Sequence, residues 1–445
     1  MLPHGRNGWA PLSGLYLRHP IIYGTYLWHP ISCLHIRESS RQRPARAEAG
    51  VTSRVVSTTE SPRRGWPRPR DAGPGQALSD RLPVPWAFPL IVFAITWLLI
   101  LAAWYGSAVI YHQGHPWTWH FAFKDANFYL GIAQYGYPAK LWTHSAIGGR
   151  PAFFPLFPVL IRLTSYLTGG HYLIAGLIAS VLAGAASAVG VWVLAARVCD
   201  RRVADRAVVL YCFFPGAMTF GMAYSEPLAV ALAAAALLAL VERRWLLAGI
   251  IGAAGTAARP TLIVLAVVSG VVAVQAIWTR RDWRALLAPA LTPLGLVAFF
   301  GYLGQRYHDY AFWFQLEKAG WNQHIDWGVH TFRIVFWADP STSRYVVFNV
   351  VLIIMFIAAV AGIGMTLAAR LPLPVTLFGI LVVLSCVIAY GQNTKPRFVW
   401  SAFTLFIGAA AKLPKVIYWP VVVLSAAGLV FLTGWWPHHV IGPAP

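Results

Sequence analysis

Long apolar runs separated by short polar turns dominate the chain from residue 86 onward. Four of them, at 86–111, 172–196, 283–302 and 345–369, are long enough to cross about 30 Å of hydrocarbon. Lipid offers no partners to backbone N–H and C=O groups, so a spanning segment must satisfy them within a helix or a closed barrel. No ten-residue alternating pattern suggests barrel strands. The pattern therefore predicts an all-α bundle of about eleven transmembrane helices, several of them short or interrupted by proline.

Composition and charge placement support the same class. Hydrophobic residues make up 58% of the chain and charged residues only 11%, whereas soluble domains carry about 25% charged residues. The net charge of +20 would also suit nucleic-acid binding, so the placement of the basic residues decides its meaning. Twelve arginines precede Trp86, and a further set lies in turns between apolar runs: Arg197, Arg201, Arg202, Arg206, Arg243, Arg244, Arg280, Arg281, Arg284, Arg370, Lys412 and Lys415.

The positive-inside rule puts these turns and the N-terminus on the cytoplasmic side of the membrane. We therefore expect membrane lipids, and no nucleic acid, as partners of the basic residues. Arginine outnumbers lysine 29 to 6, a bias typical of GC-rich bacterial genomes. The sequence thus predicts a multi-pass protein of a bacterial plasma membrane.

Residues 1–85 differ from the rest, because they are rich in Arg, Pro, Ser and Gly. This composition predicts a basic, disordered cytoplasmic tail ahead of a membrane domain at 86–445. The alternative is a mis-called start with translation beginning near Val51, since the next methionine after Met1 is Met218. The intact mass of the native protein distinguishes the two.

Two longer stretches, 112–171 and 306–344, fall on the outer side in this topology and are where function is expected. The first is a large loop whose segment 153–167 holds two prolines and Arg162, as is typical of a helix lying at the membrane interface. Histidines gather in both stretches without metal-ligand spacing, and we expect them to face the interface. The four cysteines form no C-x-x-C pair, so no zinc site or disulfide is indicated. A need for a divalent cation stays open.

Six of the fifteen acidic residues lie on the outer side: Asp125, Glu226, Asp309, Glu317, Asp326 and Asp339. Asp125 follows the first apolar run, where a carboxylate at the membrane surface can act as general base for a hydroxyl group. Alternatively, it is an interfacial acid paired with Lys124 or Lys140.

Glu226 lies at the lip of an apolar hairpin, with no basic residue near it in sequence. A carboxylate at mid-bilayer costs about 2.5 to 3.5 kcal/mol, so acids at such positions usually line a polar cavity. Alternatively, Ser225 caps the next helix and Glu226 interacts with the positive end of the helix dipole.

Arg259, Lys395 and Arg397 interrupt apolar stretches at predicted outer helix ends. Arginine offers a fork of donors that matches phosphate oxygens, and lysine adds a point charge. The alternative is that these side chains snorkel to the interface and only mark helix ends. The chain contains no G-x-x-x-x-G-K-[ST], G-x-G-x-x-G or G-x-S-x-G motif.

Five blocks in chain order resemble the PIG-V family of mannosyltransferases within the GT-C superfamily, which includes the second GPI mannosyltransferase and bacterial relatives. These blocks span most of residues 86–434 and read KDANFYLGIAQYGYP, RPAFFPLFPVLIRL, CFFPGAMTFGMAYSEPLAVAL, RRWLLAGIIGAAGTAARPT and KPRFVWSAF. The resemblance implies a GT-C-like helical enzyme. Such an enzyme moves a hexose, typically mannose, from a polyprenyl-phosphate carrier to a lipid or cell-envelope glycan acceptor on the outer face of the membrane.

Under this resemblance Asp125 matches the catalytic carboxylate of the first outer loop, Glu226 the family's Tyr-Ser-Glu and Arg259 its Arg-Pro. The family places Trp before that Asp, whereas Lys124 stands here. The predicted catalytic residues are Asp125 and Glu226, and the predicted substrate-binding residues are Arg259, Lys395, Arg397, Tyr129 and Tyr224. Two other classes fit the same features: a transporter or flippase, and a non-enzymatic scaffold of the cell envelope.

Overall fold

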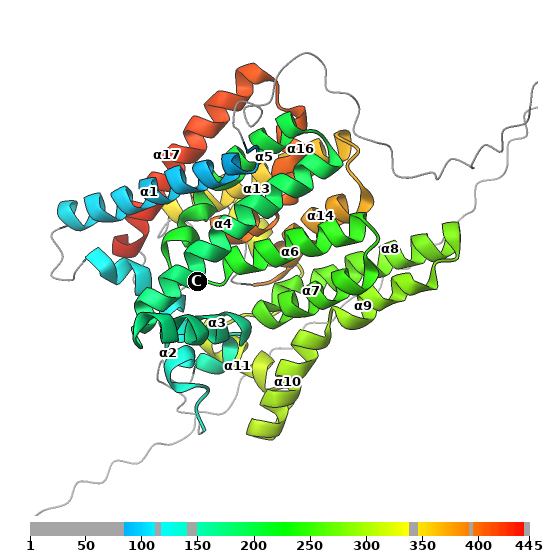
Figure 1. Ribbon diagram of the computed structural model, residues 1–445. Helices are drawn as coiled ribbons and strands as arrows, with labels where there is room; N and C mark the ends of the chain where they lie inside the picture. The colour runs from blue at the N-terminus through cyan, green and yellow to red at the C-terminus, as the bar shows by residue number, and fades with distance from the viewer. Residues whose placement is uncertain (1–83, 112–116, 140–148, 338–345, 391–394, 440–445) are drawn as a thin grey trace, which may run out of the picture. The chain divides into compact units, whose positions relative to one another are not determined.

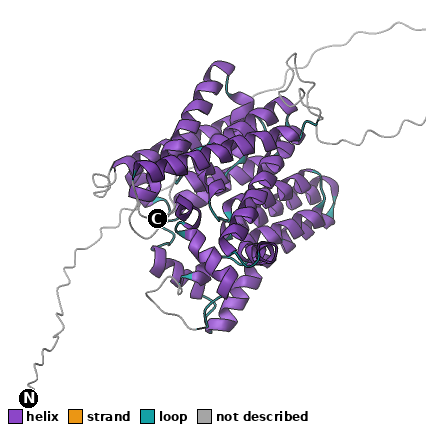
Figure 2. Ribbon diagram, turned by 60° about the vertical axis from the view of Figure 1, so that its left-hand side comes forward, coloured by secondary structure: helices purple, strands orange, loops and turns teal. Residues whose placement is uncertain are grey.

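A computed structural model describes residues 84–111, 117–139, 149–337, 346–390 and 395–439, all within the second of two units of the chain, Arg64–Pro445. The predicted tail, apart from positions 84 and 85, and the alternative start near Val51 lie outside the described residues. Every regular element in the described part is a helix, and the only strand-like pairing there is one isolated bridge between Ile325 and Ala389 (Figure 2). The all-α prediction is confirmed.

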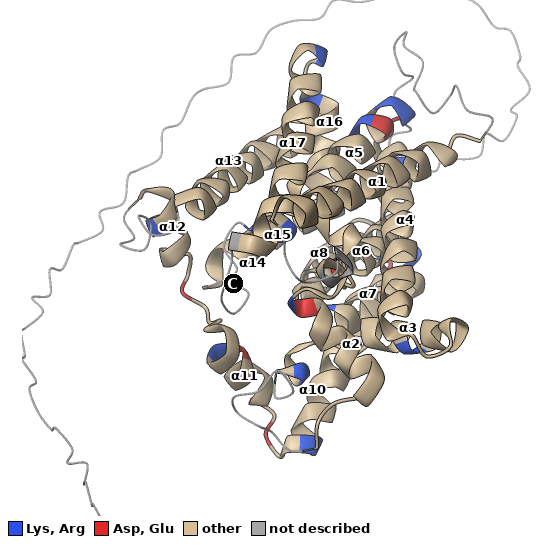
Figure 3. Ribbon diagram, turned by 90° about the vertical axis from the view of Figure 1, so that its left-hand side faces the viewer, with Lys and Arg blue, Asp and Glu red and all other residues tan. Residues whose placement is uncertain are grey.

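Six described helical segments are long and apolar enough to cross a membrane (Figure 1). They are α1 (Ala87–Ile110), α4 (Tyr172–Val198), η6 with α8 (Pro260–Ile263 and Val264–Arg280), η7 with α9 and α10 (Trp283–Leu286, Leu287–Leu291 and Leu294–Tyr307), α13 (Val346–Ala368) and α17 (Lys415–His439). No charged residue occurs in α1 or α13 (Figure 3). These helices make the chain a multi-pass membrane protein.

A seventh candidate span is broken, because α5 (Arg201–Phe213) and η5 (Pro215–Gly221) meet at an angle of 73°. Phe214 between them is extended, and Pro215 lacks the N–H that would continue the helix. Three shorter apolar helices, α6 (Glu226–Val241), α7 (Trp245–Ala258) and α14 (Leu373–Ile388), pack within the same bundle. The expected count of eleven spans stays a prediction.

The remaining described helices are shorter and connect or cover the bundle. In the segment predicted to be the first outer loop, α3 (Leu156–Ser165) buries Phe157 and Ile161 against α2 and α4 and leaves Leu163 exposed. Its interfacial position stays a prediction. The others are η2 (Trp117–Ala122), α2 (Asp125–Tyr135), η3 (Arg150–Ala152), η4 (Tyr166–Thr168), α11 (Phe312–Trp321), α12 (Val329–Val335), α15 (Pro396–Ser401) and α16 (Thr404–Lys412).

The basic turns between helices contact one another at one end of the bundle. Arg197, at the end of α4, lies 3.6 Å from Glu242 in the α6–α7 turn, and Arg206 donates to the carbonyl of Leu413 in the α16–α17 turn. The 16 residues of α6 carry the chain from this end to Glu226, about 24 Å away at 1.5 Å per residue. Glu226 is therefore separated from the basic turns by the length of α6.

The short helix α15 is held against the bend between α5 and α6 by close packing. Trp400 stacks on Tyr211 with ring centroids 4.7 Å apart and donates to its carbonyl at 2.9 Å. Gly216 in η5 leaves no room beside α15, because a Cβ there would overlap the carbonyl oxygen of Pro396 and the side chain of Trp400. This contact fixes the position of the residues next to Pro396.

Gly216→Ala is therefore expected to destabilise the protein by about 1 to 3 kcal/mol through overpacking, because the nearest obstacle is backbone and cannot rotate away. The measurement is thermal unfolding of the purified protein in detergent. Gly301→Ala in α10 is the matched control, since a Cβ there meets no atom within 4 Å. Equal midpoints for the Gly216→Ala variant and the wild type would contradict the packing argument.

Candidate active site

Asp125 is the first residue of α2, where a carboxylate interacts favourably with the positive end of the helix dipole. Its Oδ2 accepts a hydrogen bond from Arg397 Nη1 at 2.5 Å. The preceding residue, Lys124, has a φ of +53°, which is rare for any residue except glycine. The charge partner of Asp125 thus comes from 272 positions further along the chain.

Glu226 is the first residue of α6 and is fully buried. Its Oε1 lies 2.8 Å from Arg259 Nη1 and 3.7 Å from Arg397 Nη1. Arg397 therefore lies between two carboxylates, while Arg259 pairs with one of them. Because burying a carboxylate without a partner is very costly, this ion pair explains how Glu226 is tolerated in the apolar bundle.

The capping alternative for Ser225 is wrong, since Ser225 occupies the N-cap position but makes no side-chain cap hydrogen bond. Its hydroxyl instead forms a hydrogen bond of 2.6 Å with the hydroxyl of Tyr129 and accepts one of 3.2 Å from Arg259 Nη1. The hydroxyl is engaged by these two side chains, which hold it away from the backbone N–H groups of α6.

Prolines determine the backbone conformation of two basic residues of the cluster. A residue before proline is driven out of the helical region, and both Arg259, before Pro260, and Lys395, before Pro396, are extended. Helix α7 therefore ends before Arg259, and the Arg259 side chain reaches Glu226. Arg397, in the first turn of α15, reaches Asp125. The snorkelling alternative is wrong for these two arginines, whose side chains are only 14% and 15% exposed.

Lys395 is buried, and its Nζ has no hydrogen-bond partner among the described residues. Burial lowers the pKa of Lys395 well below its usual range, and the neighbouring charge of Arg397 lowers it further. Burial likewise lowers the pKa of Lys124, which is close enough to Asp125 and Arg397 to feel both charges. Two lysines and an arginine thus surround the carboxylate of Asp125.

The two tyrosines of the predicted set also lie in this cluster. Tyr129 contacts Ser225 as described above, and Tyr224 donates a hydrogen bond of 3.2 Å to the carbonyl of Phe123. The guanidinium of Arg397 lies 5.7 Å from the centre of the Tyr224 ring. All seven predicted site residues are therefore brought together, although their roles stay predictions.

A pocket of about 90 Å³ opens beside the cluster and is lined by Asp125, Tyr129, Arg259 and Arg397. The same pocket is also lined by Glu317 on α11, together with Trp313 and Trp321 of that helix. Sequence reasoning counted Glu317 among the outer acids but did not assign it to the site. The available signal was the spacing of four residues between Trp313, Glu317 and Trp321, which puts all three on one helix face.

Burial raises the pKa of Glu317 from its usual 4.5 to about 8, and the charge of Asp125 adds to the shift while that of Arg259 opposes it. Between pH 4.5 and about pH 8 the folded state binds more protons at the Glu317 carboxyl than the unfolded chain does. The free energy of unfolding therefore falls as pH rises through this interval. We expect Glu317→Gln, which cannot ionise, to remove that part of the fall. The measurement is the unfolding midpoint in detergent at several pH values. Parallel profiles for the variant and the wild type would refute the assignment.

One histidine expectation is wrong. His120 does not face an interface but is buried beside Trp104, with ring centroids 4.5 Å apart. As for metals, the described residues contain no group of three or more His, Cys, Asp or Glu side chains placed to hold an ion.

No family model matches the sequence, and no curated protein matches it. The chain is similar to solved structures of an oligosaccharyltransferase from Archaeoglobus fulgidus. The complex with an inhibitory peptide and a dolichol-phosphate is 12% identical, with a TM-score of 0.43, and the match covers 78% of this chain and 55% of that one. The apo form is 16% identical with a TM-score of 0.41, and the match covers 78% of this chain and 55% of that one. The complex with Zn and sulfate is 16% identical with a TM-score of 0.42, and the match covers 78% of this chain and 52% of that one.

The chain spans about half the length of these proteins, and a likeness this remote carries no argument about chemistry. Membership in the PIG-V family stays a prediction. The functional argument therefore depends on the cluster of charged residues itself.

Proposed function

We propose that the protein is a membrane glycosyltransferase that moves a hexose, mannose by the family resemblance, from a polyprenyl-phosphate carrier to a hydroxyl of a lipid or cell-envelope glycan. The observation that carries the proposal is the cluster in which Arg397 lies between Asp125 and Glu226 beside a small pocket. A general base and a cationic site for a leaving phosphate, held side by side, are what inverting sugar transfer requires.

In the proposed step the acceptor oxygen attacks the anomeric carbon while the bond from that carbon to the phosphate oxygen breaks. The electron pair of the broken bond stays on the polyprenyl phosphate, and the proton of the acceptor hydroxyl passes to Asp125. The negative charge that develops on the phosphate is stabilised by Arg397 and Lys395. Among the described residues no group accepts a hydrogen bond from Lys395 Nζ, and this supports the role, because Nζ can donate to a phosphate without first leaving one of them.

Arg397 links the two functions of the site. Its Nη1 donates to Asp125 Oδ2 and also lies 3.7 Å from Glu226 Oε1, so one guanidinium contacts both carboxylates. A donor phosphate that attracts Arg397 would draw its guanidinium away from Asp125 and leave that carboxylate able to accept a hydrogen bond from the acceptor hydroxyl. Glu226, paired with Arg259, holds the second side of Arg397 in place.

The test is incubation of the purified protein with radiolabelled polyprenyl-phosphomannose and a lipid acceptor extract. Label in a new, base-stable glycolipid supports the proposal. Unchanged donor overturns the proposal for mannose, provided that a thermal unfolding transition shows the preparation to be folded. Repeating the assay with polyprenyl-phosphoglucose tests the broader proposal of hexose transfer. Movement of labelled donor across a vesicle membrane without a new bond would favour the flippase alternative. The absence of both transfer and movement would favour the scaffold.

A further inference from the structure

Helix α11 contributes three side chains to the pocket beside Asp125. Trp313, Glu317 and Trp321 follow one another at intervals of four residues, so they lie on one face of the helix. Trp313 Nε1 donates a hydrogen bond of 3.1 Å to the carbonyl of Ala152 in η3, and this contact ties α11 to the other side of the pocket. The pocket is therefore lined along one helix by an indole, a carboxyl and a second indole.

The indole of Trp321 is partly exposed. The phenyl rings of Phe128 and Phe153 contact it at interplanar angles of 63° and 75°, with ring centroids 5.8 and 5.7 Å away. No aromatic ring in the described part of the chain stacks flat on this indole. A ligand with a flat apolar surface could therefore stack on it.

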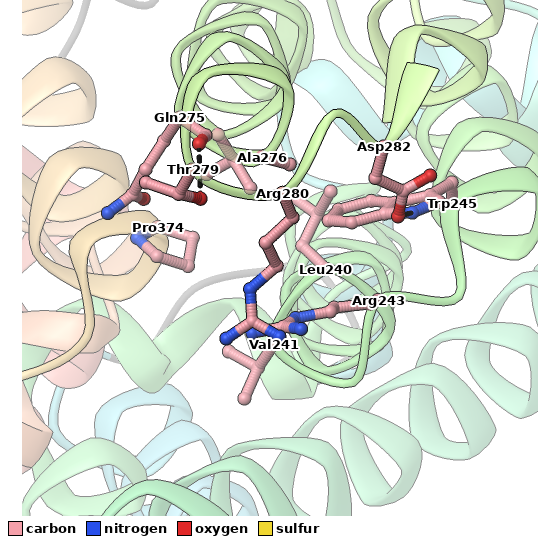
Figure 4. Close-up of a pocket in the computed structure, with 11 residues that line it drawn as sticks. Leu240, Val241, Arg243, Trp245, Gln275, Ala276, Thr279, Arg280, Asp282 and Pro374 are labelled. Carbon is pink, nitrogen blue, oxygen red and sulfur yellow. Dashed lines mark hydrogen bonds between the residues drawn. The ribbon is translucent and has the colours of Figure 1, made fainter. Parts of the chain in front are cut away.

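The carboxyl of Glu317 forms no hydrogen bond or ion pair with any described residue. A second pocket, among the basic turns at the other end of α6, also combines an indole with a carboxylate (Figure 4). There Trp245 Nε1 donates to Asp282 Oδ2 at 2.8 Å, so the acid is satisfied within the protein. Because polar groups withdrawn from water are normally hydrogen-bonded, the carboxyl of Glu317 is suited to contact a ligand in its pocket.

The surroundings restrict the chemistry of that ligand. The pocket also contains Arg259, which disfavours a cation. With a pKa of about 8, the Glu317 carboxyl is mostly protonated at pH 7, so it can both donate and accept a hydrogen bond and has little charge to attract an amine. A volume of about 90 Å³ is small beside the usual 300 to 1,000 Å³ of ligand pockets, so it fits part of one small ring and not a nucleotide or a peptide.

A pyranose ring has this combination of properties, because its hydroxyl groups lie around the edge and its C–H groups form apolar faces. We propose that α11 binds a pyranose ring of a sugar substrate, with a C–H face stacked on Trp321 and the hydroxyl groups hydrogen-bonded to Glu317. The inference rests on the proposed function, which supplies two sources of such a ring: the hexose of the donor and the glycan of the acceptor.

The experiment measures binding of methyl α-mannopyranoside and methyl α-glucopyranoside by saturation-transfer NMR, with the protein in a detergent that has no sugar headgroup. The variants Trp321→Leu and Glu317→Met are each expected to weaken binding about three- to tenfold, the loss of one aromatic contact or one hydrogen bond. The matched control is Trp278→Leu, since Trp278 is 85% exposed and does not line the pocket. The affinity of the control should equal that of the wild type.

Unchanged affinity in the Glu317→Met variant would overturn the proposal. So would the absence of binding of both glycosides to the wild type, or tighter binding of ethanolamine, because the pocket would then select a cation. If Trp321→Leu does not fold, Trp321→Phe replaces it, which keeps an aromatic ring and should weaken binding less than the loss of Glu317 does.

Initial rates of sugar transfer distinguish the two sources of the ring. A rise in KM for the polyprenyl-phosphate sugar alone in these variants assigns the ring to the donor, and a rise in KM for the acceptor alone assigns it to the glycan. Transfer with both KM values unchanged would overturn the inference and leave the proposed function intact. Glycoside binding that depends on Glu317, without any transfer, would have the opposite meaning.

Discussion

Asp125→Asn is expected to lower the rate of sugar transfer by about 10² to 10⁴-fold, the usual contribution of a positioned general base. Asparagine keeps an oxygen that can accept the hydrogen bond from Arg397, so the geometry of the cluster should survive while the proton acceptor is lost. The measurement is the initial rate of label transfer from polyprenyl-phosphomannose by purified protein at equal concentrations of folded enzyme.

The matched control is Asp309→Asn. Asp309 is another acid of the predicted outer side; its carboxylate accepts hydrogen bonds from Ala311 N and Gln315 Nε2, and it does not line the pocket. Its variant should transfer sugar at the wild-type rate. Transfer by Asp125→Asn at the same rate as the control would remove Asp125 from the mechanism, even if the protein proved to be a transferase.

The second large effect concerns the buried pair of Glu226 and Arg259. Arg259→Met leaves the carboxylate of Glu226 buried, and the one other cation paired with it among the described residues is the more distant Arg397, at 3.7 Å. Removing one partner of a buried ion pair costs about 3 to 5 kcal/mol, and we expect the lower end of this range because Arg397 remains. The free energy of unfolding in detergent and denaturant measures the loss.

Glu226→Gln/Arg259→Met removes both charges and should recover much of that loss, since the buried charge has gone. The same double variant separates a structural role from a catalytic one. If the pair only stabilises the fold, the double variant should transfer sugar normally. If Glu226 positions Arg397 as proposed, the double variant should be stable and transfer slowly. Additive stability losses for the two single changes would show that the residues do not interact.

Local chemistry was enough to predict several features of the site. The prolines after Arg259 and Lys395 mark helix boundaries in the sequence because proline restricts the residue before it, and the structure has those boundaries. Charge placement reduced the fifteen acids to six on the predicted outer side, and the family resemblance then selected Asp125 and Glu226 among them. Pairing could not be derived in this way. No local rule links Asp125 to an arginine 272 positions away.

The sequence by itself determined the helical class, the membrane-length segments and the residues available for chemistry, because lipid forces backbone groups into helices and makes each charge conspicuous. Only the tertiary structure decided which charges meet. In the folded protein Arg397 lies between Asp125 and Glu226, and Glu317 lines the pocket. Ser225, which the sequence allowed as a helix cap, forms hydrogen bonds with Tyr129 and Arg259 instead. These contacts depend on how α2, α6, α7, α11 and α15 pack, and packing of apolar surfaces is set by the shape of the whole bundle, which no short segment of the sequence encodes.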